Sequence, residues 1–258
     1  MNYAYVTLLS SVDYLPAAII LDRNLKELNS QYPLCVMVTE NIFNEVEAYL
    51  KKENISYINV PEIKYAPKTI ENMNNKRLET VASKINVFGL ECFDKVVYLD
   101  IDSFFIKTVD ELFDYPDGSL YDDGNPMRGF CGLFVCCPWA HPLEYYIILL
   151  QNSTMWESDA IENLWFPFKT NQSYHVPFPY FVNINMQNFD HLYPVKINLY
   201  GLHFCGEFKP WKFSSADAYR KTFYKDFPYP SELRDNLVQW YYTHYVEPLK
   251  NQYPEIFK

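Results

Sequence analysis

The chain has little glycine and no long uncharged apolar run, and each shortage excludes a class of protein. Only 7 of its 258 residues are glycine. None of them forms the GxGxxG, GKS or GKT patterns with which dinucleotide-binding and P-loop folds hold phosphate groups. No window of about 18 residues is both apolar and uncharged, so neither a membrane span nor membrane contact is expected.

Basic side chains are also in deficit. The chain has 22 Lys and Arg against 32 Asp and Glu, which gives a formal net charge of −10. This charge excludes nonspecific attraction to nucleic acid phosphates, so nucleic acid is not an expected partner. An anionic substrate would need a local basic patch or a bound cation.

Neither a signal peptide nor a disulfide framework is indicated. The beginning of the chain lacks a basic start and a small-residue cleavage site, and polar residues interrupt its apolar residues. The six cysteines form no CxxC pair and no regular spacing. Buried, reduced thiols are the simplest interpretation, and a cytoplasmic location is expected.

The first half of the chain alternates between strand and helix patterns. Strands are predicted at 3–9, 34–39, 56–60 and 95–100, with helical apolar spacing between them. This alternation predicts an α/β fold with a mostly parallel, Rossmann-like sheet flanked by helices. The length suits a single domain with a large core.

The second half is less regular. "MRGFCGLFVCCP" predicts a strand, "HPLEYYIILLQ" and "AIENLWF" predict helices, and 167–200 reads as loop with short strands. A C-terminal helix capped by Ser231 carries one apolar face: Leu233, Leu237, Trp240, Tyr241 and Tyr245. We expect this face to dock on the body of the protein, the alternative being an exposed contact surface.

Two aspartates close the apolar run "VVYLDIDSFF". Asp100 and Asp102 follow a predicted parallel strand, and ligands of open α/β sheets gather at the carboxyl ends of strands. If strand geometry continued, residues two apart would point the same way and could share one ligand. Carboxylates within about 4 to 6 Å repel each other unless a cation or a proton lies between them. A metal site is therefore one interpretation, and a simple turn is the other.

The segment "LHFCGEFKPW" supplies complementary chemistry. His203 offers a neutral imidazole, which suits Mn²⁺ beside carboxylates. Gly206 permits close approach of the backbone to a ligand, and Lys209 can meet a phosphate as a point charge. Each residue also has a structural explanation, but together they supply a third metal ligand and an anion contact.

With "VVYLDIDSFFIKTVDELFD" and "HFCGEFKPW" in this order, the chain resembles glycosyltransferase family 8, the glycogenin and galactinol synthase group. The resemblance covers most of the chain. It implies one GT-A-type domain over 1–258, with a nucleotide-binding half at 1–110 and a donor-sugar and acceptor half at 111–258. The implied activity is metal-dependent, retaining transfer of a hexose (glucose, galactose or N-acetylglucosamine) from a UDP-sugar to a carbohydrate, polyol or protein hydroxyl. A homodimer is compatible with it.

The resemblance also implies roles for individual residues. Mn²⁺, or Mg²⁺, would be bound by Asp100, Asp102 and His203. The UDP-sugar would be contacted by Thr7, Leu8, Tyr14, Arg77, Asp100, Ile101, Asp102, Gly206 and Lys209. The catalytic candidates are Lys84, on the helix before the metal strand, and Asp159.

Some positions depart from the family pattern and leave alternatives open. Phe130 and Cys131 stand where the family has Asn and Ser near the donor sugar, and Ala160 follows Asp159 in place of Gln. These departures motivate a second hypothesis, a non-catalytic sugar-nucleotide binder. "LDIDSFF" also resembles the DxDx(S/T) loop of haloacid dehalogenase-like phosphatases, although that loop normally follows the first strand and its GDxxxD partner is absent.

Overall fold

In the computed structural model the described residues are 1–71, 76–121, 130–154, 156, 161, 184–185, 199–204, 206–227 and 231–257. The large sheet has the order β3-β2-β1-β4-β7-β6. Its strands are β1 (Tyr3–Leu9), β2 (Leu34–Thr39), β3 (Ser56–Val60), β4 (Lys95–Leu99), β6 (Leu120–Tyr121) and β7 (Phe130–Cys136). β1 to β4 pair in parallel, whereas β7 runs antiparallel to both β4 and β6. The predicted mostly parallel α/β sheet is confirmed.

A small second sheet joins distant parts of the chain. β5 (Ser103–Phe105) pairs antiparallel with β9 (Gly201–His203), and β8 (Ile184–Asn185) pairs parallel with β9. β5 begins just after the DxD turn. The second sheet therefore carries the late segment back to the carboxyl end of β4.

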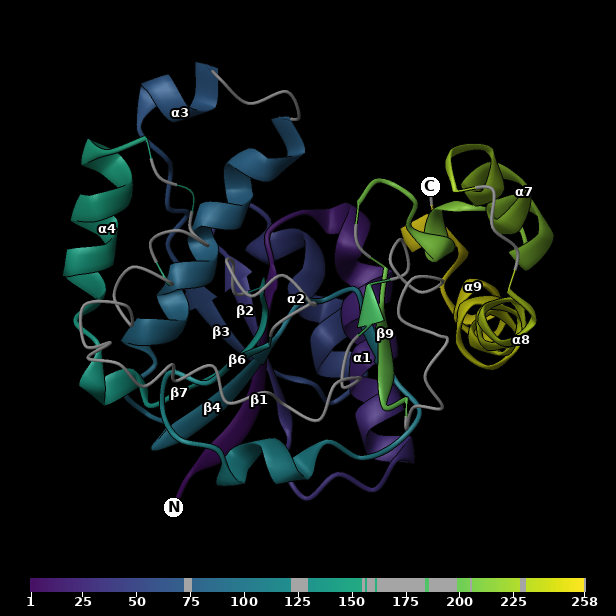
Figure 1. Cartoon of the computed structure of the whole chain (residues 1–258), viewed down its shortest axis with the longest axis horizontal. Coiled ribbons are helices and arrows are strands. Elements are labelled where there is room, and N and C mark those ends of the chain that lie inside the picture. The colour runs from purple at the N-terminus through teal and green to yellow at the C-terminus, as the bar shows by residue number, and fades with distance from the viewer. Residues whose placement is uncertain are drawn as a thin grey trace.

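Helices cover both faces of the large sheet (Figure 1). The α-helices before the C-terminal region are α1 (Leu15–Glu27), α2 (Phe43–Lys52), α3 (Pro67–Glu71) and α4 (Leu143–Asn152). The 3₁₀ segments are η1 (Val12–Tyr14), η2 (Lys76–Gly89), η3 (Asp110–Asp114), η4 (Pro138–Ala140), η5 (Pro210–Lys212) and η7 (Pro254–Phe257). The C-terminal helices are α7 (Ala216–Asp226), α8 (Glu232–Tyr241), the π-helical segment η6 (Tyr242–Val246) and α9 (Glu247–Gln252).

Two hydrophobic cores lie on opposite faces of the sheet because successive strand residues point to opposite sides. Tyr5 and Leu9 of β1 pack in the core that includes α1 and the C-terminal helices. Val6 and Leu8 pack in the core that includes η2 and α4. Each core uses alternate residues of the same strands, and burial on both faces explains their continuous apolar sequence.

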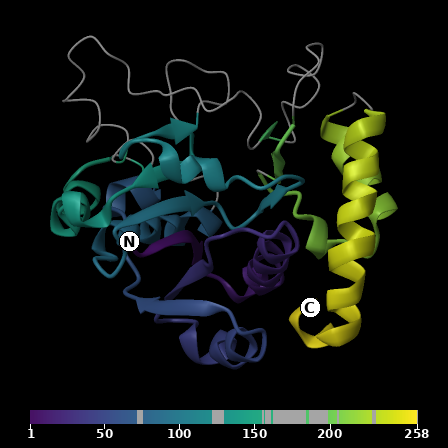
Figure 2. The ribbon, with the colours of Figure 1, turned by 90° about the horizontal axis from the view of Figure 1, so that it is seen from below.

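The C-terminal helical region docks on the body, as predicted. Tyr241 and Tyr245 are buried, and their rings lie 5.1 and 5.7 Å from the Phe104 ring. Ser231 caps α8 by accepting a hydrogen bond from Arg234 N. Figure 2 shows these helices at the opposite side of the molecule from α4. The predicted C-terminal helix is confirmed as α8, η6 and α9, which follow one another directly, and the π-helical turn η6 within it was not predicted.

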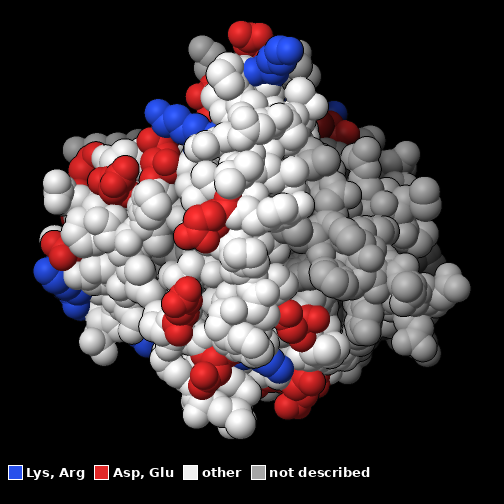
Figure 3. All heavy atoms as spheres, turned by 90° about the vertical axis from the view of Figure 1, so that its left-hand side faces the viewer, with Lys and Arg blue, Asp and Glu red and all other residues white. Residues whose placement is uncertain are grey.

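Apolar exposure occurs elsewhere, around α4. Apart from Met1, the exposed large apolar side chains of the described residues are Trp139, Tyr145 and Ile148, which are 50 to 69% exposed. This side of the molecule faces the viewer in Figure 3, where acidic side chains are scattered over a largely uncharged surface. Within the described ranges, no helix has both the length and the apolar character needed to cross a membrane.

Several predicted elements need correction or lie outside the described residues. The strand predicted at 95–100 ends at Leu99, and the helix before it is the 3₁₀ segment η2. "AIENLWF" lies outside the described residues except for Ile161, as does most of 167–200. Cys35 and Cys136 are buried free thiols, but Cys92 is exposed, so the expectation of buried thiols holds only in part.

Candidate metal and nucleotide site

A turn, rather than a continuing strand, brings the two aspartates together. Asp100 N donates to Gly132 O at 2.7 Å, the last tie to the large sheet, and Ser103 N then donates to Asp100 O at 3.0 Å. Strand geometry therefore does not continue through Asp102, yet the two carboxylates still converge. The i to i+3 bond closes a turn, and this turn aims both carboxylates at one point.

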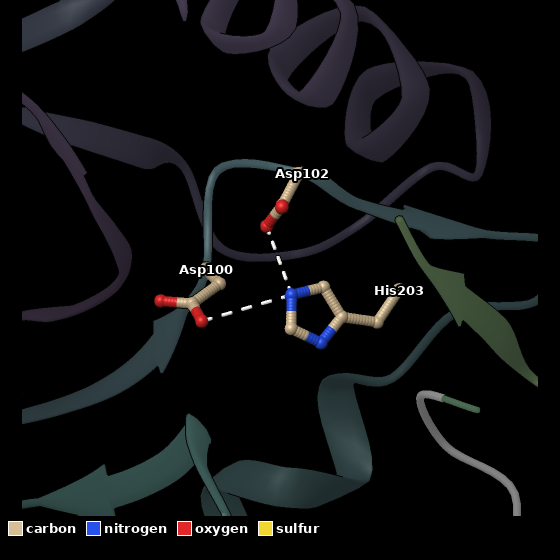
Figure 4. Close-up of side chains that lie close together, drawn as sticks. All are labelled: Asp100, Asp102 and His203. Carbon is tan, nitrogen blue, oxygen red and sulfur yellow. Dashed lines mark hydrogen bonds and ion pairs between the residues drawn. The ribbon is translucent and has the colours of Figure 1, made fainter. Parts of the chain in front are cut away.

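His203 reaches the same point from β9. Ser103 and His203 are paired in the β5–β9 register, and Phe204 N donates to Asp102 O at 3.0 Å. His203 Nε2 lies 2.9 Å from Asp102 Oδ1 and 3.7 Å from Asp100 Oδ2 (Figure 4). Ligand atoms of the three residues all lie within 4.8 Å of one another. Two carboxylate oxygens and one imidazole nitrogen form a donor set that fits Mn²⁺.

Two lysines flank this acidic cluster. Lys84 Nζ, from η2, lies 3.0 Å from Asp100 Oδ1. Lys209 Nζ contacts Asp102 Oδ2 and donates to Phe204 O at 2.6 Å. Both lysine residues are nearly fully buried. Buried ammonium groups are stable only when paired, so the carboxylates and lysines stabilise one another.

The protonation of Asp102 follows from these neighbours. Burial alone would raise the pKa of its carboxyl group, but the charges of Lys209 and His203 and the hydrogen bonds from both outweigh burial. The pKa of Asp102 is therefore held well below its ordinary value. Asp102 is ionised at neutral pH, which is the form that can bind a cation.

The predicted nucleotide contacts lie near this cluster to different degrees. Thr7 and Leu8 are at the carboxyl end of β1 and are almost completely buried. The Tyr14 ring lies 5.5 Å from the Trp211 ring, and Lys209 Nζ is 5.8 Å from the centre of the Tyr14 ring. Tyr14 thus shares a cluster with Lys209, whereas the contacts of Thr7 and Leu8 with a nucleotide stay predictions.

Of the remaining predicted site residues, the structure describes some and not others. Gly206 has φ 82°, a left-handed conformation that favours glycine, and Ile101 lies between the two aspartates with only 8% exposure. Arg77 lies in η2, and its side chain is not described. Asp159 and the neighbouring Ala160 lie outside the described residues.

The departures from the family pattern can be placed only through the backbone. Phe130 and Cys131 begin β7, just before Gly132, whose carbonyl accepts the Asp100 hydrogen bond. The backbone at these two positions therefore leads directly to the aspartate turn. That these two positions lie near the donor sugar stays a prediction.

Two contacts on the elements around the site were not predicted. Lys84 Nζ lies 5.3 Å from the centre of the Tyr98 ring, and the hydroxyl oxygens of Ser10 and Thr80 are 2.9 Å apart. Tyr98 lies on β4, two residues before Asp100, so the period of the strand predicted at 95–100 could have placed the two on one face. No local pattern links Ser10, after β1, to Thr80 in η2.

No protein-family model matches the chain. Several curated proteins do match it in sequence. Glycogenin of Neurospora crassa is 30% identical over 217 residues, which are 80% of this chain and 31% of that protein. Galactinol synthase 4 of Arabidopsis thaliana is 28% identical over 145 residues, which are 56% of this chain and 41% of that protein. The chain thus spans less than half the length of each of these two relatives.

Solved structures agree on the fold. Galactosyltransferase LgtC, in complex with donor and acceptor sugar analogs, matches with a TM-score of 0.55 and 17% identity, over 91% of this chain and 99% of its own. This chain therefore has a fold of the GT-A type found in such glycosyltransferases. Its curated homologues are glycogenin and galactinol synthase, so the resemblance to glycosyltransferase family 8 is confirmed.

Proposed function

We propose that this chain is a metal-dependent, retaining glycosyltransferase that moves a hexose from a UDP-sugar to an acceptor hydroxyl. The observation that carries the proposal is the convergence of Asp100, Asp102 and His203, flanked by Lys84 and Lys209. The curated homologues support the same class of reaction. The acceptor would be a carbohydrate, a polyol or a protein hydroxyl.

The charges of this cluster suit a diphosphate. The two carboxylate charges of Asp100 and Asp102 are balanced by the two ammonium charges of Lys84 and Lys209. With neutral His203, a divalent cation would leave the group two charges positive. In a chain of net charge −10, this is a local positive field that could hold a nucleoside diphosphate.

The metal, Mn²⁺ or Mg²⁺, would be held by Asp100, Asp102 and His203. When bound, such an ion acts as a Lewis acid that stabilises negative charge on a departing phosphate. Lys209 would add a fixed positive charge on the same side, and Lys84 would hold Asp100 in place through their ion pair. Gly206, in its left-handed conformation, would let the backbone approach the diphosphate closely.

The proposed stereochemistry is retention. Among the described residues near the cluster, Asp100 and Asp102 contact lysines and His203. Neither carboxylate is therefore free to attack the anomeric carbon of the donor sugar as a nucleophile. The remaining candidate, Asp159, lies outside the described residues. We favour attack by the acceptor on the same face as the departing phosphate, which takes up the acceptor proton.

The proposal extends to the organisation of the protein. Residues 1–110 would supply most nucleotide contacts, and 111–258 would supply Lys209 and the donor-sugar and acceptor contacts. Thr7, Leu8, Tyr14 and Arg77 would surround the nucleotide. A cytoplasmic location and a homodimer complete the proposal.

The decisive experiment measures UDP release from a panel of UDP-sugars with Mn²⁺, with Mg²⁺ and with EDTA. We expect metal-dependent release with one donor and none from the Asp102→Asn variant, while Asp217→Asn, which changes an exposed surface carboxylate, keeps full activity. Full activity of Asp102→Asn would contradict the proposal. Binding of UDP and Mn²⁺ without turnover of any donor would instead favour a non-catalytic binder, for which Phe130 and Ala160 are the motivating observations.

A further inference from the structure

The π-helical segment η6 places the hydroxyls of two buried tyrosines on Pro210, next to Lys209, and on Asn24, which binds the strand after Asp102. η6 lies between α8 and α9, and Pro248 near the beginning of α9 has no N–H with which to continue the α-helical ladder. Tyr242 and Tyr245 are buried within this segment. Short π-helical segments inside α-helices frequently occur at functional sites.

Tyr242 supports the segment that carries Lys209. Its hydroxyl donates to the carbonyl oxygen of Pro210, the residue directly after Lys209. Trp211 Nε1 fixes the same 3₁₀ turn from the other side by donating to Asp13 O at 3.0 Å. The Tyr242 hydroxyl therefore sets the position from which Lys209 reaches Asp102.

Tyr245 supports the strand that follows Asp102, through Asn24. Asn24 Nδ2 donates to Phe105 O at 2.8 Å, and Asn24 Oδ1 accepts from Phe105 N at 2.8 Å. The Asn24 side-chain amide thus bonds both backbone groups of Phe105, as the backbone of an adjacent strand would. Asn24 Nδ2 uses its second hydrogen on the Tyr245 hydroxyl at 3.2 Å, and that hydroxyl donates to Glu27.

The two supports, Tyr242 with Pro210 and Tyr245 with Asn24 and Phe105, each reach a segment that carries a residue of the site. Phe105 belongs to β5, whose first residue follows Asp102 and is paired with His203. Pro210 follows Lys209, which contacts Asp102. The bonds of Tyr242 to Pro210, of Asn24 to Phe105 and of Asn24 to Tyr245 are buried. A donor or acceptor left unsatisfied there is costly, so these bonds permit only a narrow range of positions.

We propose that Tyr242 and Tyr245 are positioning residues that fix the geometry of the metal and diphosphate site through Pro210 and through Asn24 and Phe105. This inference rests on the proposed function. Neither tyrosine contacts the ligand in the proposal. Outer partners of metal ligands typically affect metal affinity by about 10- to 100-fold, because they orient the ligands.

The test uses Tyr242→Phe and Tyr245→Phe in the full chain, since each change removes a hydroxyl and keeps the packed ring. Tyr253→Phe is the matched control, because Tyr253 is also a buried C-terminal tyrosine whose hydroxyl is bonded, at 2.7 Å to Glu53, but it lies outside both supports. Calorimetric titration with UDP in saturating Mn²⁺ measures affinity, and thermal unfolding measures stability. We expect affinity to fall about tenfold in the two variants. In the control, only the unfolding midpoint should fall.

The outcomes separate the two proposals. Affinities equal to wild type in both variants, with midpoints lowered as in the control, would show a structural role alone and overturn the positioning proposal. Failure of the wild-type chain to bind UDP with Mn²⁺ would overturn the proposed function itself. If the two supports are independent, the double variant should lose affinity by the product of the single losses.

Discussion

His203 Nε2 lies 2.9 Å from Asp102 Oδ1, although 101 positions separate the two residues in the chain. The contact is set by backbone pairing, because Ser103 and His203 are partners in the β5–β9 register. The His203 imidazole is therefore held beside the aspartates by a paired strand, β9, and not by a loop. Sites built on strands hold their ligands in a defined geometry.

Removal of His203 should weaken the metal site. We expect His203→Ala to lower the affinity for Mn²⁺ in the presence of UDP by more than about 100-fold, above the range typical of outer partners. Mn²⁺ binding can be followed by electron paramagnetic resonance. The control is His244→Ala, because His244 is exposed in the C-terminal helices, where its Nδ1 lies 3.0 Å from the Trp240 carbonyl oxygen. Equal Mn²⁺ affinity in both variants would contradict the metal site.

Removal of Lys84 should affect turnover. Lys84→Met deletes the positive charge 3.0 Å from Asp100 Oδ1 that holds this carboxylate in place, and we expect kcat for UDP-sugar turnover to fall about 10- to 100-fold. Steady-state kinetics with saturating Mn²⁺ provide the measurement. Lys64→Met serves as control because the Lys64 side chain is 71% exposed and distant in sequence from the motifs. A normal kcat in Lys84→Met would remove Lys84 from the proposed mechanism.

Glu53 should contribute stability that depends on pH. Burial would raise the pKa of this carboxyl group, but hydrogen bonds from Tyr253 and Arg23, the Arg23 charge and Gln252 lower it overall. A lowered folded-state pKa stabilises the protein above the unfolded pKa of about 4.3, and this stability is lost as the pH falls through the folded value. Glu53→Gln should therefore lower the free energy of unfolding by about 1 to 2 kcal/mol at pH 7.

Urea unfolding at several pH values tests this prediction. The difference between wild type and Glu53→Gln should shrink as the pH falls below about 4.3. Glu40→Gln, at an exposed position, should show no such difference at any pH. A Glu53→Gln effect that is constant between pH 7 and pH 3 would show that the carboxylate charge does not matter.

Two cysteines should differ in reactivity. Burial, with a smaller contribution from Cys92, raises the pKa of the Cys35 thiol to about 12, whereas Cys92 itself is exposed. Because the thiolate is the reactive form, iodoacetamide at pH 8 should modify Cys92 in the folded protein and leave Cys35 intact until unfolding. Peptide mass spectrometry identifies each site, and Cys92→Ser provides the control. Rapid modification of native Cys35 would contradict its burial.

The parallel half of the fold was predictable because its strands are short apolar runs with clear ends. The bounds predicted for β1, β2 and β3 are those of the structure. The 3₁₀ character of η2 was not predicted, since apolar residues three positions apart, such as Leu78 and Val81, suit a 3₁₀ helix as well as an α-helix. Periodicity alone does not separate the two.

The candidate site was predictable in its ligands but not in its supports. Asp100, Asp102 and His203 were identified because they stand in recognisable segments, and the structure brings them together. The bond network of Asn24 and Tyr245 joins residues 221 positions apart and leaves no periodic trace in the sequence. Such contacts depend on tertiary packing, which local patterns do not encode.

The pairing of β5 with β9 also determines when the cation site can exist during biosynthesis. A nascent chain released only as far as β5 would present Asp100 and Asp102 without His203 or Lys209. Closure of so long a loop is slow compared with local helix formation. Cation binding at this cluster would therefore be a late event, possible only after translation has passed Lys209 and β5 has paired with β9.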